Sequence, residues 1–179
     1  MRLWHYELLD CLDDFHIISQ WRELLAIKGA IDKNGTPNHR LVNKVLDYNI
    51  NEFKSYTGLV VAEMITRNIK YSKNKFDEIV DWECRLFDNS QINKNGFLWH
   101  DKRYLTQCYY NLQEKYDCGI VSKDAWIKIE NKYKMLLVEK IEPENYKFND
   151  ISKIYIDFNE ESIQDFTKYV LKNIKGAIQ

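Results

Sequence analysis

Four polar residues near the beginning of the chain fall on one face of a predicted helix. At 100° per residue, His16, Ser19, Gln20 and Glu23 lie within an arc of about 100°. Apolar residues fill the opposite side of the same helix: Ile17, Ile18, Trp21, Leu24 and Leu25. We therefore expect a helix with one packing face and one face that is available for chemistry.

The α-amine of Met1 and the carboxylate of Glu23 are together sufficient for imine chemistry. An α-amino group has a pKa of about 7.7 to 8.0, compared with about 10.4 for a lysine side chain. Roughly a fifth of it is therefore neutral at neutral pH, and it can attack an electrophilic sugar carbon. A nearby carboxylate stabilises the positive charge that develops on the sugar and assists later proton transfers. This chemistry requires neither a metal nor a cofactor, and we expect none.

The composition is typical of a globular protein. The chain has 179 residues, of which 45% are hydrophobic and 14% aromatic, which suffices for one domain with a substantial core. No stretch approaches the roughly 18 apolar residues of a membrane span, and the first residues do not resemble a signal peptide. The four cysteines are scattered without a CxxC pair, so neither a zinc site nor a disulfide framework is predicted. We expect a cytoplasmic monomer with no membrane partner.

Hydrophobic spacing predicts an all-α fold with little or no sheet. The first helix is expected over residues 11–28, with Asp10 or Asp13 as its N-cap and Gly29 as its end, and 32–37 reads as a turn. The other helices are expected over 37–48, 51–68, 72–87, 101–118, 122–140 and 160–175, with caps at Asn51, Ser72 and Ser122 and an end at Gly119. Residues 88–96 form a polar loop, and only 153–158 alternate like a strand. We divide the chain into a helical domain, 1–140, and a C-terminal extension, 141–179, whose role the sequence does not indicate.

Two segments carry a family resemblance. They are the opening Met1-Arg2-Leu3-Trp4-His5 and the run His16-Ile17-Ile18-Ser19-Gln20-Trp21-Arg22-Glu23-Leu24. Both resemble the pyrimidine-dimer DNA glycosylase family, whose fold is small and almost wholly helical. The similarity is closest over residues 1–29 and continues more loosely through 38–42 and 53–68. Residues 100–105 and 111–115 look similar to bacterial versions of the family.

The resemblance implies a bifunctional enzyme, a glycosylase and abasic-site lyase that acts on damaged double-stranded DNA. The N-terminal amine attacks C1′ of the damaged nucleotide, a Schiff base forms, and β-elimination cuts the strand. Glu23 would be the catalytic carboxylate, and Arg22 would hold the flanking phosphate and the glutamate. His16 would bind or polarise the sugar and phosphate. The nucleotide must be flipped out of the helix, at a cost of a few kcal/mol that is lower at damaged pairs.

Two positions depart from the family's pattern. The family's nucleophile is a threonine that removal of the initiator methionine exposes, whereas residue 2 here is Arg2, which is too large for ordinary methionine removal. Either the amine of Met1 is the nucleophile, displaced by one residue, or the mechanism is lost, and Arg2 is free to contact phosphate. The family's second arginine, three residues beyond the glutamate, is replaced by Ala26, which Lys28 does not obviously replace.

Charge indicates a modest DNA-binding surface. The formal net charge of −1 argues against a generally basic nucleic-acid binder. Between residues 16 and 45, however, five basic residues accompany two acidic ones, for a net charge of +3. We expect a weak or strongly salt-sensitive affinity for DNA. The residues expected to contact it are Arg2, Arg22, Lys28, Lys33, His39, Arg40 and Lys44.

The remaining histidines and aromatic residues have structural interpretations. His5 is expected to pack beside Trp4, and His100 to cap the helix that follows it. Aromatic side chains at helical spacing are expected in the core rather than on bases, and these are Tyr104, Tyr109, Tyr110, Tyr116, Trp21, Trp82, Trp99 and Trp126.

A second class of function stays open. The chain is then a non-catalytic helical module that binds DNA or another protein on the same fold, as Arg2, Ala26 and the net charge suggest. The substitution Glu23→Gln separates the two classes, because only an enzyme loses cleavage while it keeps binding damaged DNA. The sequence does not identify the damaged base.

Overall fold

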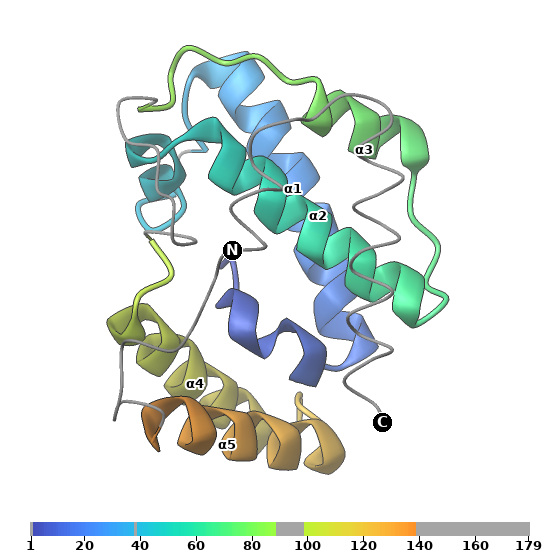
Figure 1. Ribbon diagram of the computed structural model, residues 1–179, viewed down its shortest axis with the longest axis vertical. Coiled ribbons are helices and arrows are strands. Elements are labelled where there is room, and N and C mark those ends of the chain that lie inside the picture. The colour runs from blue at the N-terminus through green and yellow to red at the C-terminus, as the bar shows by residue number, and fades with distance from the viewer. Residues whose placement is uncertain (1, 38, 89–98, 139–179) are drawn as a thin grey trace.

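The computed structural model describes residues 2–37, 39–88 and 99–138 (Figure 1). Within these residues every regular element is a helix and there is no strand, which confirms the all-α prediction. No helix among them is long and apolar enough to cross a membrane. The predicted strand 153–158, the predicted helix 160–175 and the whole extension 141–179 lie outside the described residues, as does the loop 88–96 after its first residue.

The first two helices are η1 (Tyr6–Cys11), a 3-10 helix, and α1 (Asp14–Asn34). Asp13 is the N-cap of α1, as predicted, but the predicted end at Gly29 is wrong. Helix α1 continues because Ile31 is buried in the core and Lys28 forms an i,i+4 ion pair with Asp32. It ends instead at Gly35, whose φ of 73° is the left-handed conformation that favours glycine.

The helix predicted over 37–48 is reduced to a short 3-10 helix, η2 (Asn43–Asp47). The side chain of Asn43 accepts a hydrogen bond from the backbone of His39, and such local bonds favour a turn over a continuous helix. Helix α2 (Ile50–Thr66) follows closely, but its N-cap is Asn49 rather than the predicted Asn51. The Asn49 side chain accepts from the Asn51 backbone, so the true cap lies two residues earlier.

Helix α3 (Lys73–Val80) is capped by Ser72, as predicted, but it ends at Val80 rather than at Phe87. The chain leaves the helix there, and Trp82 and Phe87 pack their rings against Phe53 of α2. Helices α4 (Lys102–Asp117) and α5 (Lys123–Val138) agree closely with the predicted 101–118 and 122–140.

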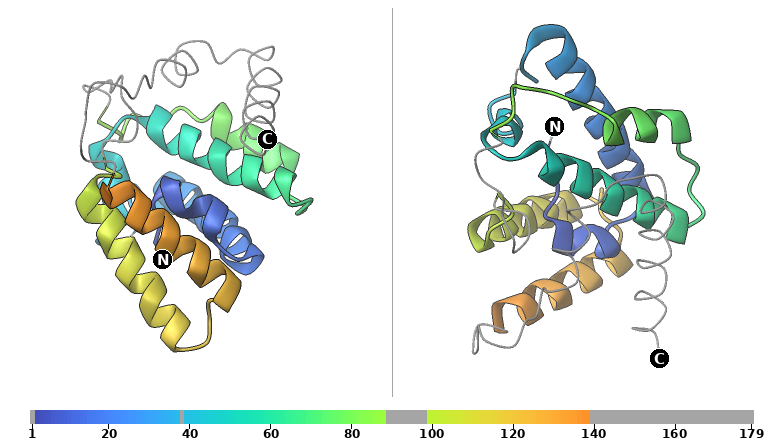
Figure 2. Two further views of the ribbon diagram at one scale, coloured as in Figure 1. Left: turned by 60° about the horizontal axis from the view of Figure 1, so that its bottom comes forward. Right: turned by 45° about the horizontal axis from the view of Figure 1, so that its top comes forward.

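The helices form two groups with the start of the chain between them (Figure 1). Helices α1 and α2 pack together in one group, and α4 and α5 form a hairpin in the other. Figure 2 shows α4 and α5 side by side from two further directions. Helix η1 contacts α2 on one side and α5 on the other. The N-terminal residues are therefore an internal part of the fold, enclosed by helices that follow much later in the sequence.

Aromatic side chains fill the contact between α4 and α5. The rings of Tyr109 and Tyr133 stack with centroids 3.9 Å apart, and Tyr116 stacks on Trp126. Trp21 and Trp82 are buried, and Trp99 and Trp126 are partly buried against the core. The predicted core role of these tryptophans is confirmed. The same prediction is wrong for Tyr110, which is 56% exposed.

Candidate functional site

The polar face of α1 is covered by the start of the chain rather than by solvent. His16 and Gln20 are only 3% and 1% exposed, and Glu23 is half-buried. One carboxylate oxygen of Glu23, Oε2, accepts a hydrogen bond from the backbone amide of Arg2 over 3.1 Å. The side-chain amide of Gln20 lies 3.4 Å from the same oxygen. The geometry thus joins the N-terminal end of the protein to the carboxylate that the sequence singled out.

Residues 2–5, which we call the N-terminal strap, belong to no helix. The amide of Trp4 donates to Gln20 Oε1 over 2.8 Å. The hydroxyl of Tyr56, on α2, lies 2.7 Å from the Trp4 carbonyl oxygen and 3.1 Å from Gln20 Oε1. Burial raises the pKa of Tyr56 well above its ordinary value, so this hydroxyl remains a hydrogen-bond donor.

Helix α4 holds the opposite edge of the strap. The hydroxyl of Tyr104 donates to the carbonyl oxygen of Leu3, and the backbone of His5 is hydrogen-bonded to the thiol of Cys108. The backbone contacts of the strap thus alternate in side, because those of residues 2 and 4 face α1 and α2 while those of residues 3 and 5 face α4. The sequence placed Tyr104 in the core and assigned no separate role to Gln20 or Tyr56. For Gln20 a signal was present, because it lies three residues before Glu23 on the same face of the predicted helix.

The side chain of Arg2 also turns toward α4. Burial raises the pKa of the Cys108 thiol to about 11, and the Arg2 guanidinium beside it acts in the opposite direction. The Nη1 atom of Arg2 is fully buried. The Arg2 residue is therefore half-buried, with one guanidinium nitrogen enclosed, and its predicted contact with phosphate remains a prediction.

His16 lies on the same face as Glu23 but a full two turns earlier, about 10 Å along the axis of α1. Its ring packs near Trp4 and Phe15, and its Nδ1 lies 4.0 Å from Asp13 Oδ2. Neither ring nitrogen forms a hydrogen bond within the described part of the chain. Burial, followed by the charge of Lys115, lowers the pKa of His16, so the neutral ring is favoured. The structure thus brings Arg2 to Glu23 but does not bring His16 there.

Most of the residues expected to contact DNA are accessible. Lys28 and His39 are half-buried, and Lys28 lies 5.3 Å from the ring centre of Trp82 in addition to its 2.7 Å ion pair with Asp32. Four of the expected DNA-contact residues are exposed, and these are Arg22, Lys33, Arg40 and Lys44. Arg22 follows directly after the buried Trp21 and precedes Glu23, so an exposed cation and the carboxylate occupy successive positions of α1.

Two histidines form a buried pair next to the strap. His5 Nε2 lies 2.8 Å from the carbonyl oxygen of His100, and His100 Nδ1 accepts from the Tyr6 amide. Burial lowers the pKa of His5 to about 4, and burial with the neighbouring His5 lowers that of His100 well below its ordinary value. His5 is a packing residue, as predicted. The prediction that His100 caps α4 is wrong, because Asp101 accepts from the Tyr104 amide and forms the cap.

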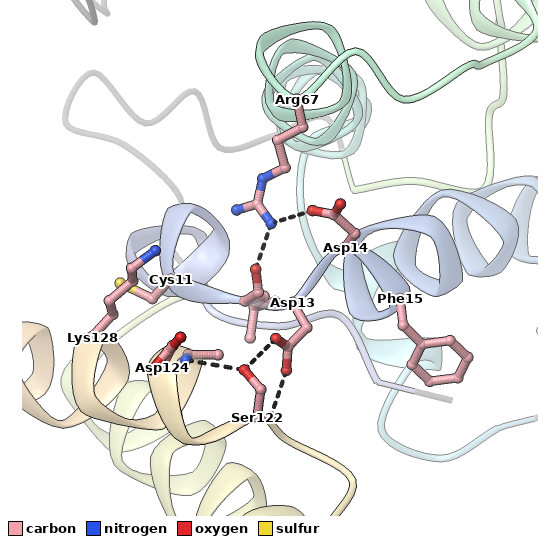
Figure 3. Close-up of a pocket in the computed structure, with 10 residues that line it drawn as sticks. Cys11, Asp13, Asp14, Phe15, Arg67, Ser122, Asp124 and Lys128 are labelled. Carbon is pink, nitrogen blue, oxygen red and sulfur yellow. Dashed lines mark hydrogen bonds and ion pairs between the residues drawn. The ribbon is translucent and has the colours of Figure 1, made fainter.

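An open pocket of about 500 Å³ lies at the N-terminal end of α1 (Figure 3). It is lined by residues of η1, α1 and α5 and by Arg67 at the end of α2. Arg67 donates to the carbonyl oxygens of Leu9, Asp10 and Leu12 and forms ion pairs with Asp14 and Glu63. Asp13 accepts from both the amide and the hydroxyl of Ser122. These contacts join η1 to the helices around it, about 13 Å along α1 from Glu23.

Comparisons with known proteins give one match. The family model described as pyrimidine dimer DNA glycosylase matches residues 1–78, which include the strap, all of α1 and α2, and Glu23. Searches of curated proteins and of solved structures found no match. The match extends the resemblance seen in residues 1–29 through the whole α1–α2 group.

Proposed function

We propose that this chain, whose first 78 residues match the pyrimidine dimer DNA glycosylase family, excises damaged pyrimidines from double-stranded DNA and cleaves the strand at the resulting abasic site. The observation that carries the proposal is the hydrogen bond between the Arg2 amide and Glu23 Oε2. An α-amino group on the preceding residue is three covalent bonds from this nitrogen, so bond lengths alone keep it within about 4 Å of the Arg2 nitrogen and within about 7 Å of Glu23 Oε2. An amine and a carboxylate on neighbouring segments are the two groups that imine chemistry requires.

The reaction begins as the neutral N-terminal amine attacks C1′ of the flipped nucleotide. The bond between C1′ and the base breaks, its electron pair leaves with the base, and the base takes up a proton. The amine loses a proton to the medium as C1′ and nitrogen form a double bond, and the sugar ring opens with protonation of O4′. This Schiff base is a cation, and Glu23 beside it supplies the compensating negative charge.

Strand cleavage follows from the Schiff base. A base removes a proton from C2′, the electrons form a double bond between C2′ and C3′, and the phosphate at C3′ leaves with its electron pair. Water then hydrolyses the imine and releases the amine. Glu23 is suitably placed to assist the proton transfers, because its half-buried carboxylate lies against the N-terminal strap.

The DNA contacts in this proposal are electrostatic. Arg22, next to Glu23, holds the phosphate that flanks the damaged nucleotide, and Lys33, Arg40 and Lys44 contact the backbone farther along the duplex. His16 acts on the sugar or phosphate only if binding moves it into reach, because the structure has it enclosed by Trp4 and Phe15. No cofactor is required, and we propose a cytoplasmic monomer.

A borohydride trapping experiment tests the proposal. The full chain is incubated with duplex DNA that contains an abasic site, or with ultraviolet-irradiated DNA, and then reduced. We expect a covalent adduct with each DNA, and peptide mapping should place it on residue 1. An adduct on a lysine would assign a different nucleophile, and no adduct with either DNA from folded protein would refute the lyase.

The alternative function is a non-catalytic module that binds DNA or another protein. The half-buried Arg2 favours it, because one of its guanidinium nitrogens is enclosed and removed from phosphate. In that case the same fold binds damaged DNA without cleaving the strand. Mass analysis of the purified N-terminus is the first discriminating measurement, since a blocked residue 1 has no free amine and supports only the module.

A further inference from the structure

Two buried side chains that take no part in the proposed chemistry hold the strap on α1. Gln20 accepts from the Trp4 amide, and Tyr56 donates toward the Trp4 carbonyl and toward Gln20 itself. We infer that Gln20 and Tyr56 are positioning residues, which fix the strap so that the N-terminal amine and the Glu23 carboxylate meet. This inference rests on the proposed function, and it concerns residues to which the family match assigns no role.

The orientation of the Gln20 amide is determined by its partners. A backbone nitrogen can only donate, so the Gln20 atom that faces the Trp4 amide over 2.8 Å must be the oxygen. The Gln20 nitrogen is then the atom that faces Glu23 Oε2, 3.4 Å away. A single amide thereby couples the position of the strap to the position of the carboxylate.

Burial makes these contacts difficult to replace with water. Gln20 is 1% exposed and Tyr56 is fully buried, and the Tyr56 hydroxyl has one hydrogen to share between two oxygen acceptors. Loss of either side chain leaves polar groups of Trp4 unpaired in the interior, which is costly. The strap then gains freedom to move from its position.

The position of the strap along α1 depends on these two residues. On the side that faces α1 and α2, the strap is held by the Arg2 bond to Glu23 and by the Trp4 bonds to Gln20 and Tyr56. A shift of one residue in an extended chain reverses the side to which each amide points. The Trp4 contacts prevent such a shift. Because Gln20 and Tyr56 make these contacts, Glu23 is not needed to hold Trp4 and can take part in the reaction.

The test compares three variants of the full chain. Tyr56→Phe removes only the hydroxyl and preserves the packed ring, and Gln20→Met removes both amide contacts at a similar volume. The matched control is Tyr133→Phe, which removes a hydroxyl that donates to Thr106 from another nearly buried ring, in α5. The measurements are kcat and KM on an abasic-site duplex, and the pKa of the α-amine from the pH dependence of its labelling without DNA.

We expect kcat to fall roughly tenfold to a hundredfold in Tyr56→Phe and Gln20→Met, because small displacements of reacting groups have effects of this size. KM should stay near the parental value, since the exposed DNA-contact residues are untouched. Labelling of the α-amine in these two variants should follow a pH profile that differs from the parent's and is closer to that of a free α-amine, whose pKa is about 7.7 to 8.0. Tyr133→Phe should leave kcat, KM and the pH profile of α-amine labelling unchanged.

Parental kcat and parental α-amine pKa in Tyr56→Phe would overturn the positioning role, and so would an equal loss in Tyr133→Phe. If the parent itself traps no DNA, the proposed function fails, but the α-amine pKa still decides whether the strap is positioned. Should Gln20→Met fail to fold, Tyr56→Phe decides the question, because it changes almost no packed volume.

Discussion

The amide nitrogen of Arg2 donates to the Glu23 carboxylate over 3.1 Å, across 21 residues of sequence. This contact defines the site more closely than the polar stripe does, because the stripe includes His16, which lies two turns of α1 away. The groups that the proposed mechanism uses are therefore located where the strap meets α1. Arg22, the residue before Glu23, is exposed.

Glu23→Gln should separate chemistry from binding. Glutamine retains an oxygen that accepts from the Arg2 amide but carries no charge, so the cationic Schiff base loses its counter-charge. We expect cleavage of an abasic-site duplex to slow by about 10²- to 10⁴-fold while the affinity for the duplex is preserved. Single-turnover cleavage and fluorescence anisotropy measure the two effects. Glu130→Gln, which breaks an ion pair in α5, is the control, and unchanged cleavage in Glu23→Gln would favour the non-catalytic module.

Lengthening the N-terminus should abolish trapping. Two residues added ahead of Met1 move the α-amine by up to about 7 Å, which is too far for Glu23 to act on it. We expect the yield of borohydride-trapped adduct to fall at least about tenfold with no change in thermal unfolding. The same two residues added after Gln179 provide the control. Undiminished trapping on the new first residue would show that the position of the amine is not fixed by the strap.

The sequence predicted the caps of two helices correctly. Ser72 and Ser122 precede α3 and α5, and each side chain accepts a hydrogen bond from an amide three residues later. The end of α1 was not predictable in this way, because Gly29 and Gly35 look alike in sequence. The burial of Ile31 and the ion pair between Lys28 and Asp32 favour continuation of the helix through the first glycine.

The residues that hold the site could not be predicted from spacing. Tyr56 and Tyr104 bond to the strap from 52 and 101 residues away, and both occur at helical spacing that is typical of core residues. The polar stripe was expected to face solvent, but Gln20 is buried because the strap covers it. A covering segment that follows no periodic pattern leaves no signal in the helix beneath it.

Acid should destabilise the fold through His5. Its folded-state pKa is about 4 against an ordinary 6.5, so between these values the unfolded chain binds the proton more tightly. The free energy of unfolding should therefore fall as the pH drops from 6.5 to 4, by about 3 kcal/mol from this residue. Urea unfolding at several pH values measures the slope. His5→Gln should reduce the slope in this window, and an identical slope in the variant would assign the acid sensitivity elsewhere.

Arg67→Lys should destabilise the protein without affecting the chemistry directly. The guanidinium donates to three carbonyl oxygens around the end of η1 and to two carboxylates, and an ammonium group cannot reproduce this geometry (Figure 3). We expect a loss of about 1 to 3 kcal/mol in the free energy of unfolding. The exposed Arg103→Lys serves as the comparison, and equal stability of the two variants would contradict the role of Arg67.

Salt should weaken DNA binding in proportion to the phosphates that the protein neutralises. Each contact contributes about 0.9 to the slope of log K against log salt, because it releases condensed counterions. Arg40→Ala, at an exposed position, should lower affinity similarly for damaged and undamaged duplexes and reduce the slope by about 1. Lys123→Ala, at the start of α5, should alter neither quantity if the interface follows the strap and α1. Anisotropy titrations from low to moderate salt measure both slopes, and an equal change in Lys123→Ala would extend the interface to α5.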